Sequence, residues 1–290
     1  MARLPLLRLK PRPAPARPAA PTRGEVALHQ RLRRWAWSGV IIGALVTLVL
    51  QAPAAWLASV VTSASGGRVQ LAEAEGTLWT GSAVMVLTAG SGSRDARTLP
   101  GRLEWTLRPS GLAWQLGLRQ ACCLNGLTQL RVQPGFGRVR VEVLPGGDWL
   151  GLWPAALLTG LGTPWNTLQP SGALRLVTRA LTFEWVQGRF VLDGEAQLEL
   201  LDFASRLSTL PRLGSYRLTL SGDRNQAGTL QVLLTTLDGA LRLSGQGSWS
   251  ASGMRLRGEA TAAEADQAAL NNLLNIIGRR EGARSIISIG

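Results

Sequence analysis

The chain has 290 residues, a formal net charge of +13 and one histidine, and its aromatic residues are mostly tryptophan. That histidine, His29, lies near the amino terminus, which excludes Ser-His-Asp, Cys-His and histidine-based metal sites from the rest of the chain. Carboxylates are sparse and no phosphate-binding glycine motif occurs, so we expect neither an enzyme nor a bound cofactor or metal. The excess positive charge is concentrated at the amino end and no nucleic-acid-binding motif follows it, so we expect no nucleic-acid partner.

The first 34 residues form a leader rich in Pro, Ala and Arg. They include nine Arg and Lys residues against one acid, Glu25. A segment of this composition cannot bury enough apolar surface to fold, so we expect a disordered, basic, cytoplasmic leader over 1–34. Positive residues beside a membrane helix remain on the cytoplasmic side. The topogenic residues expected here are Arg31, Arg33 and Arg34.

The next stretch, residues 35–57, is apolar and contains no charged residue. About 20 helical residues cross the hydrocarbon core of a bilayer, so this stretch predicts a single transmembrane helix. With the leader in the cytoplasm, the bulk of the chain would lie in the periplasm of a Gram-negative cell, held at the inner membrane. The expected anchor residues are Trp35, Trp37, Val40, Ile41, Ile42, Leu45, Leu48, Leu50 and Trp56.

A cleavable signal peptide is the alternative interpretation of the amino end. A basic leader, an apolar segment and the sequence Ala52-Pro53-Ala54 are typical of one. The leader is long for a signal peptide, however, and the apolar character continues past Ala54, which favours an anchor. Pro53 is expected to kink or end the helix.

The sequence changes character after a linker, which we place at 58–67. Apolar and polar residues alternate in many short segments, for example 102–107, 139–143 and 216–220. Period-two alternation predicts antiparallel strands that are buried on one face. We therefore expect a mainly β fold over 68–290, a curved and mostly antiparallel sheet or sandwich of roughly a dozen strands with one or two short covering helices.

A Trp-rich connector, residues 145–171, interrupts the strands and divides the domain into possible sub-regions 68–144 and 172–290. A short helix is expected at Ala155 to Leu161. The connector also holds three tryptophans that either plug one end of the core or form a partner surface. These are Trp149, Trp153 and Trp165.

Two further features complete the domain. Residues 264–277 have an apolar stripe at helical spacing, which predicts a helix that covers the sheet, and 285–289 read as a terminal strand. The adjacent pair Cys122 and Cys123 could close a vicinal disulfide, stay reduced or bridge to another chain, and we expect a structural role.

Four segments resemble the type II secretion system protein N family. They are A-E-G-T-L-W-T-G at 74–81, L-S-T-L-P-R-L-G-S-Y-R-L at 207–218, L-L-T-T-L-D-G-A-L-R-L-S-G-Q-G-S-W at 233–249 and N-N-L-L-N-I-I-G-R-R at 271–280. Their order and spacing are similar to that family over about 66–290. The residues that carry the resemblance are Gly76, Thr77, Leu78, Trp79, Gly81, Leu213, Gly214, Tyr216, Gly239, Trp249, Asn272, Leu273, Gly278 and Arg279.

The resemblance implies a non-enzymatic inner-membrane component of the general secretion pathway, which exports folded periplasmic proteins across the outer membrane. Its expected partners are other subunits of that system, on the inner-membrane platform or the secretin side, and the inner membrane itself. The alternative function is a membrane-anchored lipid-binding or lipid-transfer module with an apolar β trough. That alternative is motivated by strands that place Leu, Val and Trp on one face.

Overall fold

The structure is a computed structural model that describes residues 23–90, 92–187, 189–222, 228–250 and 253–290, with side chains from Trp35 onward except that of Ile289. Residues 1–22 of the expected leader and the side chains of Arg31, Arg33 and Arg34 lie outside this description, whereas residues 23–34, expected to be disordered, are helical. The chain divides into two compact units, Met1–Leu50 and Gln51–Gly290.

The described part of the first unit is one helix, α1 (Arg23–Leu50). Its described apolar side chains are largely exposed, including Trp35, Val40 and Leu50. No helix among the described residues combines the length and the hydropathy needed to cross a membrane.

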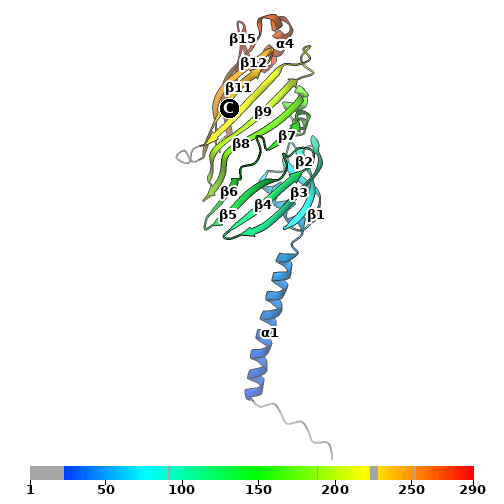
Figure 1. Cartoon of the computed structure of the whole chain (residues 1–290), viewed down its shortest axis with the longest axis vertical. Helices are drawn as coiled ribbons and strands as arrows, with labels where there is room; N and C mark the ends of the chain where they lie inside the picture. Colours follow the sequence, from blue (N-terminus) through cyan, green and yellow to red (C-terminus); the bar gives the residue numbers. More distant parts are fainter. Residues whose placement is uncertain (1–22, 91, 188, 223–227, 251–252) are drawn as a thin grey trace, which may run out of the picture. The chain divides into compact units, whose positions relative to one another are not determined.

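The second unit is built on one antiparallel sheet of fifteen strands (Figure 1). The first half comprises β1 (Val69–Gly76), β2 (Thr80–Thr88), β3 (Ala96–Ser110), β4 (Ala113–Gln120), β5 (Thr128–Gly135), β6 (Arg138–Val143) and β7 (Gly151–Pro154). The second half comprises β8 (Ser171–Val186), β9 (Arg189–Ala204), β10 (Gly214–Gly222), β11 (Thr229–Asp238), β12 (Leu241–Ser250), β13 (Gly253–Ala262), β14 (Arg279–Glu281) and β15 (Arg284–Ile289).

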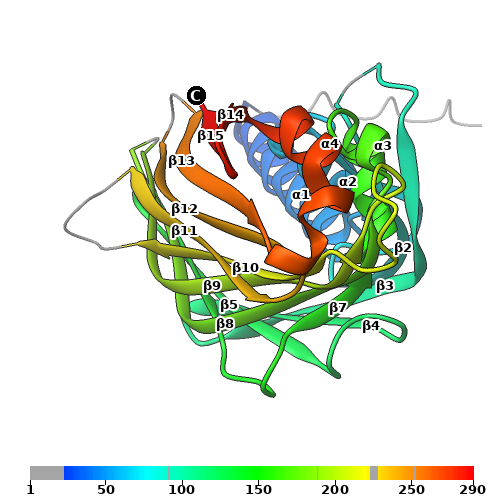
Figure 2. The ribbon, with the colours of Figure 1, turned by 90° about the horizontal axis from the view of Figure 1, so that it is seen from above.

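The sheet is a meander in which almost every strand pairs with the strands before and after it. The order runs from β1 to β6, continues from β8 to β13, and ends with β15 and β14, while the short β7 pairs with β8. The sheet curves strongly, and α3 and α4 lie inside the curve (Figure 2). The mainly β prediction is confirmed, and the two expected sub-regions are parts of one sheet because β6 pairs directly with β8.

The far end of the predicted anchor differs from the structure. Helix α1 ends at Leu50, and a separate helix, α2 (Ala54–Ala64), begins after Pro53. Residues expected to form the end of the membrane helix and the flexible linker are thus part of the β domain, since α2 packs on β1 and β2. Its core contacts bury Ala54 against Leu71, Ala83, Leu103 and Trp105.

The connector folds as a short 3₁₀ helix, η1 (Ala155–Leu161), followed by α3 (Trp165–Leu168). The expected helix at this place is therefore present but is 3₁₀ and not α-helical. It packs on β2, β3 and β8. Gly160 makes the close approach possible, because a Cβ atom there would lie 2.7 Å from the carbonyl oxygen of Leu87. Arg97 Nε donates to Thr159 Oγ1 at 2.9 Å and ties the connector to β3.

The expected carboxy-terminal helix is α4 (Gln267–Ile277), preceded by a 3₁₀ turn, η3 (Glu264–Asp266). Its apolar stripe covers the last strands, as the spacing predicted. The core that it forms with them consists of Phe203, Leu213, Tyr216, Leu241, Ala260, Leu270, Leu273 and Leu274. Ser285 on the expected terminal strand donates its hydroxyl to the carbonyl oxygen of Leu274 at 2.6 Å, which fixes the helix to β15.

Candidate functional site

The inner face of the curved sheet is a continuous apolar surface. Helices cover it only in part: α2 packs on the first strands, and α4 packs on the last. Between them, register places one apolar row across six strands, made by Pro109, Trp114, Val132, Val141, Phe183 and Leu192. Trp114, Val132, Val141 and Phe183 are half-buried. The middle of the inner face is therefore a row of apolar side chains, most of them partly exposed.

The outer face carries charged side chains in cross-strand pairs. Glu199 on β9 lies between Arg175 on β8 and Arg217 on β10, each its direct neighbour in register. Arg175 Nε donates to Glu199 Oε2 at 2.6 Å, and Arg217 Nε donates to Oε1 at 2.8 Å. The two arginines cover the carboxylate so fully that the Glu199 side chain is only 2% exposed.

Burial and charge act in opposite directions on Glu199. Desolvation raises the pKa of its carboxyl group, but the hydrogen bonds and positive charges of Arg217 and Arg175 outweigh this effect and hold the pKa below its usual range. Sequence inspection did not single out Glu199, because only the strand register shows that two arginines flank it.

We expect Glu199→Gln to lower the free energy of unfolding at pH 7 by about 1–3 kcal/mol, the range for charge-assisted hydrogen bonds. Because the folded-state pKa is depressed, the carboxylate stabilises the fold above its unfolded pKa of roughly 4 and loses this effect as pH falls through the folded value. The difference between variant and wild type, measured by urea unfolding, should therefore shrink toward pH 3. Glu195→Gln is the matched control on the same strand and face, and its more exposed pair with Arg179 should contribute under about 1 kcal/mol. A pH-independent difference would contradict this account.

The first group of signature residues forms the turn between β1 and β2. The Thr77 amide donates to the carbonyl oxygen of Thr80 at 2.8 Å, which closes the turn. Gly76 has φ +87°, a conformation that favours glycine. Gly81 makes room for a tryptophan, because a Cβ atom there would lie 2.5 Å from the Trp105 ring. The Trp105 indole in turn donates to the carbonyl oxygens of Thr77 and Leu78 at 3.2 Å.

The second group of signature residues meets beneath α4. Leu213 is fully buried there, and Leu273 on the helix is 2% exposed. Gly214 and Gly239 touch backbone to backbone, since a Cβ atom on Gly239 would lie 2.2 Å from the Gly214 Cα. Tyr216 donates its hydroxyl to the carbonyl oxygen of Leu241 at 2.9 Å, and burial raises the pKa of this tyrosine far above its usual value. These signature positions serve packing.

The remaining signature residues have separate roles. Gly278 follows α4, where a Cβ atom would lie 2.5 Å from the carbonyl oxygen of Ile286. Trp79 packs on Trp114 with ring centroids 5.3 Å apart. The structure gives no specific contact that explains the exposed Asn272, while Trp249 is 48% exposed on the inner face and Arg279 pairs with Glu281.

The three tryptophans of the connector have different surroundings, and among the described residues no ring contact joins them. All three are half-buried. Trp153 lies over Gly151, where any Cβ atom would overlap its ring. Trp149 lines a cavity of about 440 Å³, together with Asn125 and Arg179. The partner surface expected at Trp149, Trp153 and Trp165 stays a prediction.

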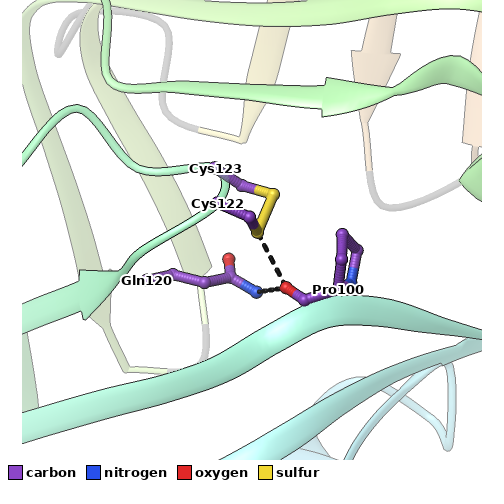
Figure 3. The surroundings of a disulfide bond; sticks show 4 residues. All are labelled: Pro100, Gln120, Cys122 and Cys123. Atoms are coloured by element: carbon purple, nitrogen blue, oxygen red, sulfur yellow. Dashed lines mark hydrogen bonds between the residues drawn. A yellow bond between two sulfur atoms is a disulfide. The ribbon is translucent and has the colours of Figure 1, made fainter.

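Cys122 and Cys123 are joined in a vicinal disulfide with an Sγ–Sγ distance of 2.10 Å (Figure 3). The pair lies in the connection between β4 and β5, and the Cys122 Sγ atom lies 2.7 Å from the carbonyl oxygen of Pro100. Gln120 Nε2 donates to the same oxygen at 3.1 Å. The structure thus presents the first of the three states considered for this pair, and the hydrogen bond from Gln120, the last residue of β4, fastens the strand end beside the disulfide to β3.

Fold and surfaces together define a class of protein: an open, curved antiparallel meander with an apolar inner face and helices packed near both ends. The model of the type II secretion system protein N family matches residues 67–287. The chain belongs to that family, as the four segments indicated, and is therefore connected with type II secretion and the other components of that system. Comparisons with curated proteins and with solved structures gave no match.

Proposed function

We propose that the chain is a non-enzymatic inner-membrane subunit of the type II secretion system, acting by binding other subunits and not by catalysis. The observation that carries this proposal is the family match over nearly all of the β domain, from residue 67 to residue 287. Export of folded proteins across the outer membrane requires subunits on both sides of the periplasm to be connected. A rigid sheet that is held at the inner membrane is suited to that role.

The anchor in this proposal is the carboxy-terminal part of α1, with the apolar segment 35–50 in the hydrocarbon core and the turn that precedes it at the headgroup level, where arginine side chains can extend to water. The amino terminus lies in the cytoplasm and the β domain in the periplasm. The segment contains no charge, and three arginines, Arg31, Arg33 and Arg34, precede it. The β domain starts directly after it, at Gln51. Residues 51–57 belong to that domain because Ala52 and Ala54 are buried in it.

Surfaces for other subunits are offered by the sheet's two edges. An unpaired strand edge can template pairing with another chain. The edge strands are β1 and the three-residue β14. The register of β1 is irregular between Ala72 and Glu75, so only its first half, Val69 to Ala72, is a regular strand edge. This edge is longer than that of β14. The Trp-rich connector is the second proposed surface.

Deleting residues 35–50 is expected to abolish secretion and to release a folded β domain from the inner membrane. The measurement is alkaline carbonate extraction of membranes, which removes peripheral proteins, combined with a secretion assay. Replacing 35–50 by an unrelated apolar span of equal length is the control and should restore membrane retention. Carbonate-resistant retention of the deletion variant would contradict the anchor, as would a mature wild-type chain that begins near Ala54 and is freely soluble.

The second candidate function, lipid binding or transfer, is favoured by the half-buried apolar row in the middle of the inner face. Acyl chains fit such a surface because it is long, continuous and uncharged. Mass spectrometry of the gently purified chain separates the two functions. Co-purifying phospholipid favours the lipid module, whereas secretion subunits without lipid favour the assembly role.

A further inference from the structure

We propose that one end of the sheet, formed by the β3–β4 and β5–β6 hairpins, lies on the surface of an anionic phospholipid bilayer. Leu112 and Phe136 enter the membrane interface, and the arginines beside them bind lipid phosphates. The orientation of this surface rests on the proposed anchor, but the contact itself is tested separately.

The two hairpin tips present apolar side chains directly to solvent. Leu112 is 99% exposed and Phe136 is 109% exposed. A single exposed leucine is ordinary, but two fully exposed apolar side chains on neighbouring tips form a local apolar surface. Gly111 (φ +64°) and Gly137 (φ +66°) shape the turns that hold them outward. Neither side chain contributes to a core, so packing within the domain does not explain their presence.

The two hairpins are neighbours that share one cavity of about 540 Å³. Leu112 of the first hairpin and Gly135 of the second line it, so the two tips lie on either side of it. Three arginines also line this cavity, and Glu184 is the one acid among its lining residues; the arginines are Arg131, Arg138 and Arg140. The space between the apolar tips is therefore positively charged.

These arginines retain capacity to bind an anion. The Arg131–Glu142 pair is long at 3.6 Å, and the Arg140–Glu184 pair is long at 3.5 Å. The Arg140 Nε atom is buried without a hydrogen-bond partner among the described residues. Arg138 is exposed beside the Phe136 tip. Guanidinium groups bind phosphate through paired hydrogen bonds, and basic residues around inserted apolar side chains are typical of surfaces that bind anionic lipid.

The chain enters the β domain at this same end of the sheet. Ala52 accepts a hydrogen bond from the Leu78 amide at 2.8 Å, and Pro53 pairs with Thr77, so the entry point lies at the β1–β2 turn. In an antiparallel meander alternate turns share an end, which places the β1–β2, β3–β4 and β5–β6 turns together. The proposed anchor ends at Leu50, almost directly before Ala52. The chain therefore passes from the proposed anchor into this end of the sheet with almost no intervening residues.

The test is photo-crosslinking of the full chain in vesicles of phosphatidylethanolamine and phosphatidylglycerol. Benzoylphenylalanine replaces Leu112 or Phe136 in separate variants, and Leu127 in the control. Leu127 is also an exposed leucine, 46% exposed, but lies in the β4–β5 connection at the other end of the strands. After irradiation, mass spectrometry measures phospholipid attached to each position. We expect several-fold more lipid adduct at 112 and 136 than at 127, and fewer phosphatidylglycerol adducts in Arg131→Gln/Arg138→Gln.

Three outcomes overturn the inference: equal adduct at all three positions, no lipid adduct at 112 and 136, or unchanged phosphatidylglycerol adducts in the double variant. Carbonate extraction of the same vesicles reports the anchor independently. If the chain is extracted while 112 and 136 are still labelled before extraction, the anchor fails and the surface contact stands. If the chain resists extraction without labelling at either tip, the anchor stands and the contact fails.

Discussion

Replacing Trp105 with alanine is expected to lower the free energy of unfolding of the β domain by about 3–5 kcal/mol, the range for removing a buried large aromatic side chain. Trp105 is 2% exposed and packs in the core between α2 and the first strands. Loss of the Trp105 side chain would leave a cavity beside Gly81. It would also remove the indole hydrogen-bond donor from the carbonyl oxygens of Thr77 and Leu78. Circular dichroism during urea unfolding of the full chain in mild detergent measures the change.

Two control variants separate packing from the hydrogen bond at Trp105. Trp105→Phe retains most of the ring but removes the Nε1 donor, and should cost about 1–2 kcal/mol. Trp249→Ala removes a tryptophan that is 48% exposed and should cost less than half of the Trp105→Ala effect, since less apolar area is lost. If Trp105→Ala and Trp249→Ala lowered the free energy of unfolding equally, the core around Trp105 and its hydrogen bonds to the β1–β2 turn would not stabilise the domain as described.

Leu274→Ala in α4 is expected to lower the free energy of unfolding by about 2–5 kcal/mol, because a fully buried leucine is replaced in a close-packed core. The carbonyl oxygen of Leu274 also accepts the Ser285 hydroxyl, so the cavity opens beside the attachment of helix to strand. The same urea experiment measures the loss. Protection of the β15 amides from hydrogen exchange should fall with it.

Ile276→Ala is the matched control for Leu274→Ala. Ile276 lies two residues further along the same helix and is 56% exposed, so its truncation should change the free energy of unfolding by less than about 1 kcal/mol. Alanine favours a helix more than leucine or isoleucine does, so helix propensity cannot account for a loss in either variant. Equal losses for Leu274→Ala and Ile276→Ala would therefore contradict the assignment of the stabilisation to the buried Leu274 side chain.

Much of the β domain could be predicted from the sequence, because alternation reports directly on strands with one buried face. The covering helix near residues 267–277 was predicted for a similar reason: its stripe of Leu270, Leu273 and Leu274 has the spacing of a helix that packs on one side. The kink or end expected at Pro53 corresponds to a break between two helices, α1 ending at Leu50 and α2 beginning at Ala54, because proline lacks the amide hydrogen that a continuous helix needs.

Other features required the strand register or tertiary packing. Helix α2 is rich in Ala, Val and Ser, a composition that an anchor's end and a buried amphipathic helix share, so hydropathy alone joined it to the apolar segment. The two arginines that donate hydrogen bonds to Glu199, Arg175 and Arg217, lie 24 and 18 residues away from it in sequence. Likewise, the exposed tips at Leu112 and Phe136 became candidates for a binding surface only once the structure showed that their hairpins share a cavity.

The order of strands has a consequence for how the domain forms during synthesis. From β1 to β13 each principal strand pairs with its sequence predecessor, so most of the long-range pairing in the sheet joins strands that follow one another along the chain. Pairing a strand with its predecessor closes a shorter loop than pairing it with a more distant strand, and so costs less loop entropy. As the chain is synthesised from its amino end, each new strand can pair with the strand already in place. Assembly of this sheet can thus keep pace with synthesis, and it finishes when β15, which follows α4 in the chain, pairs with β13.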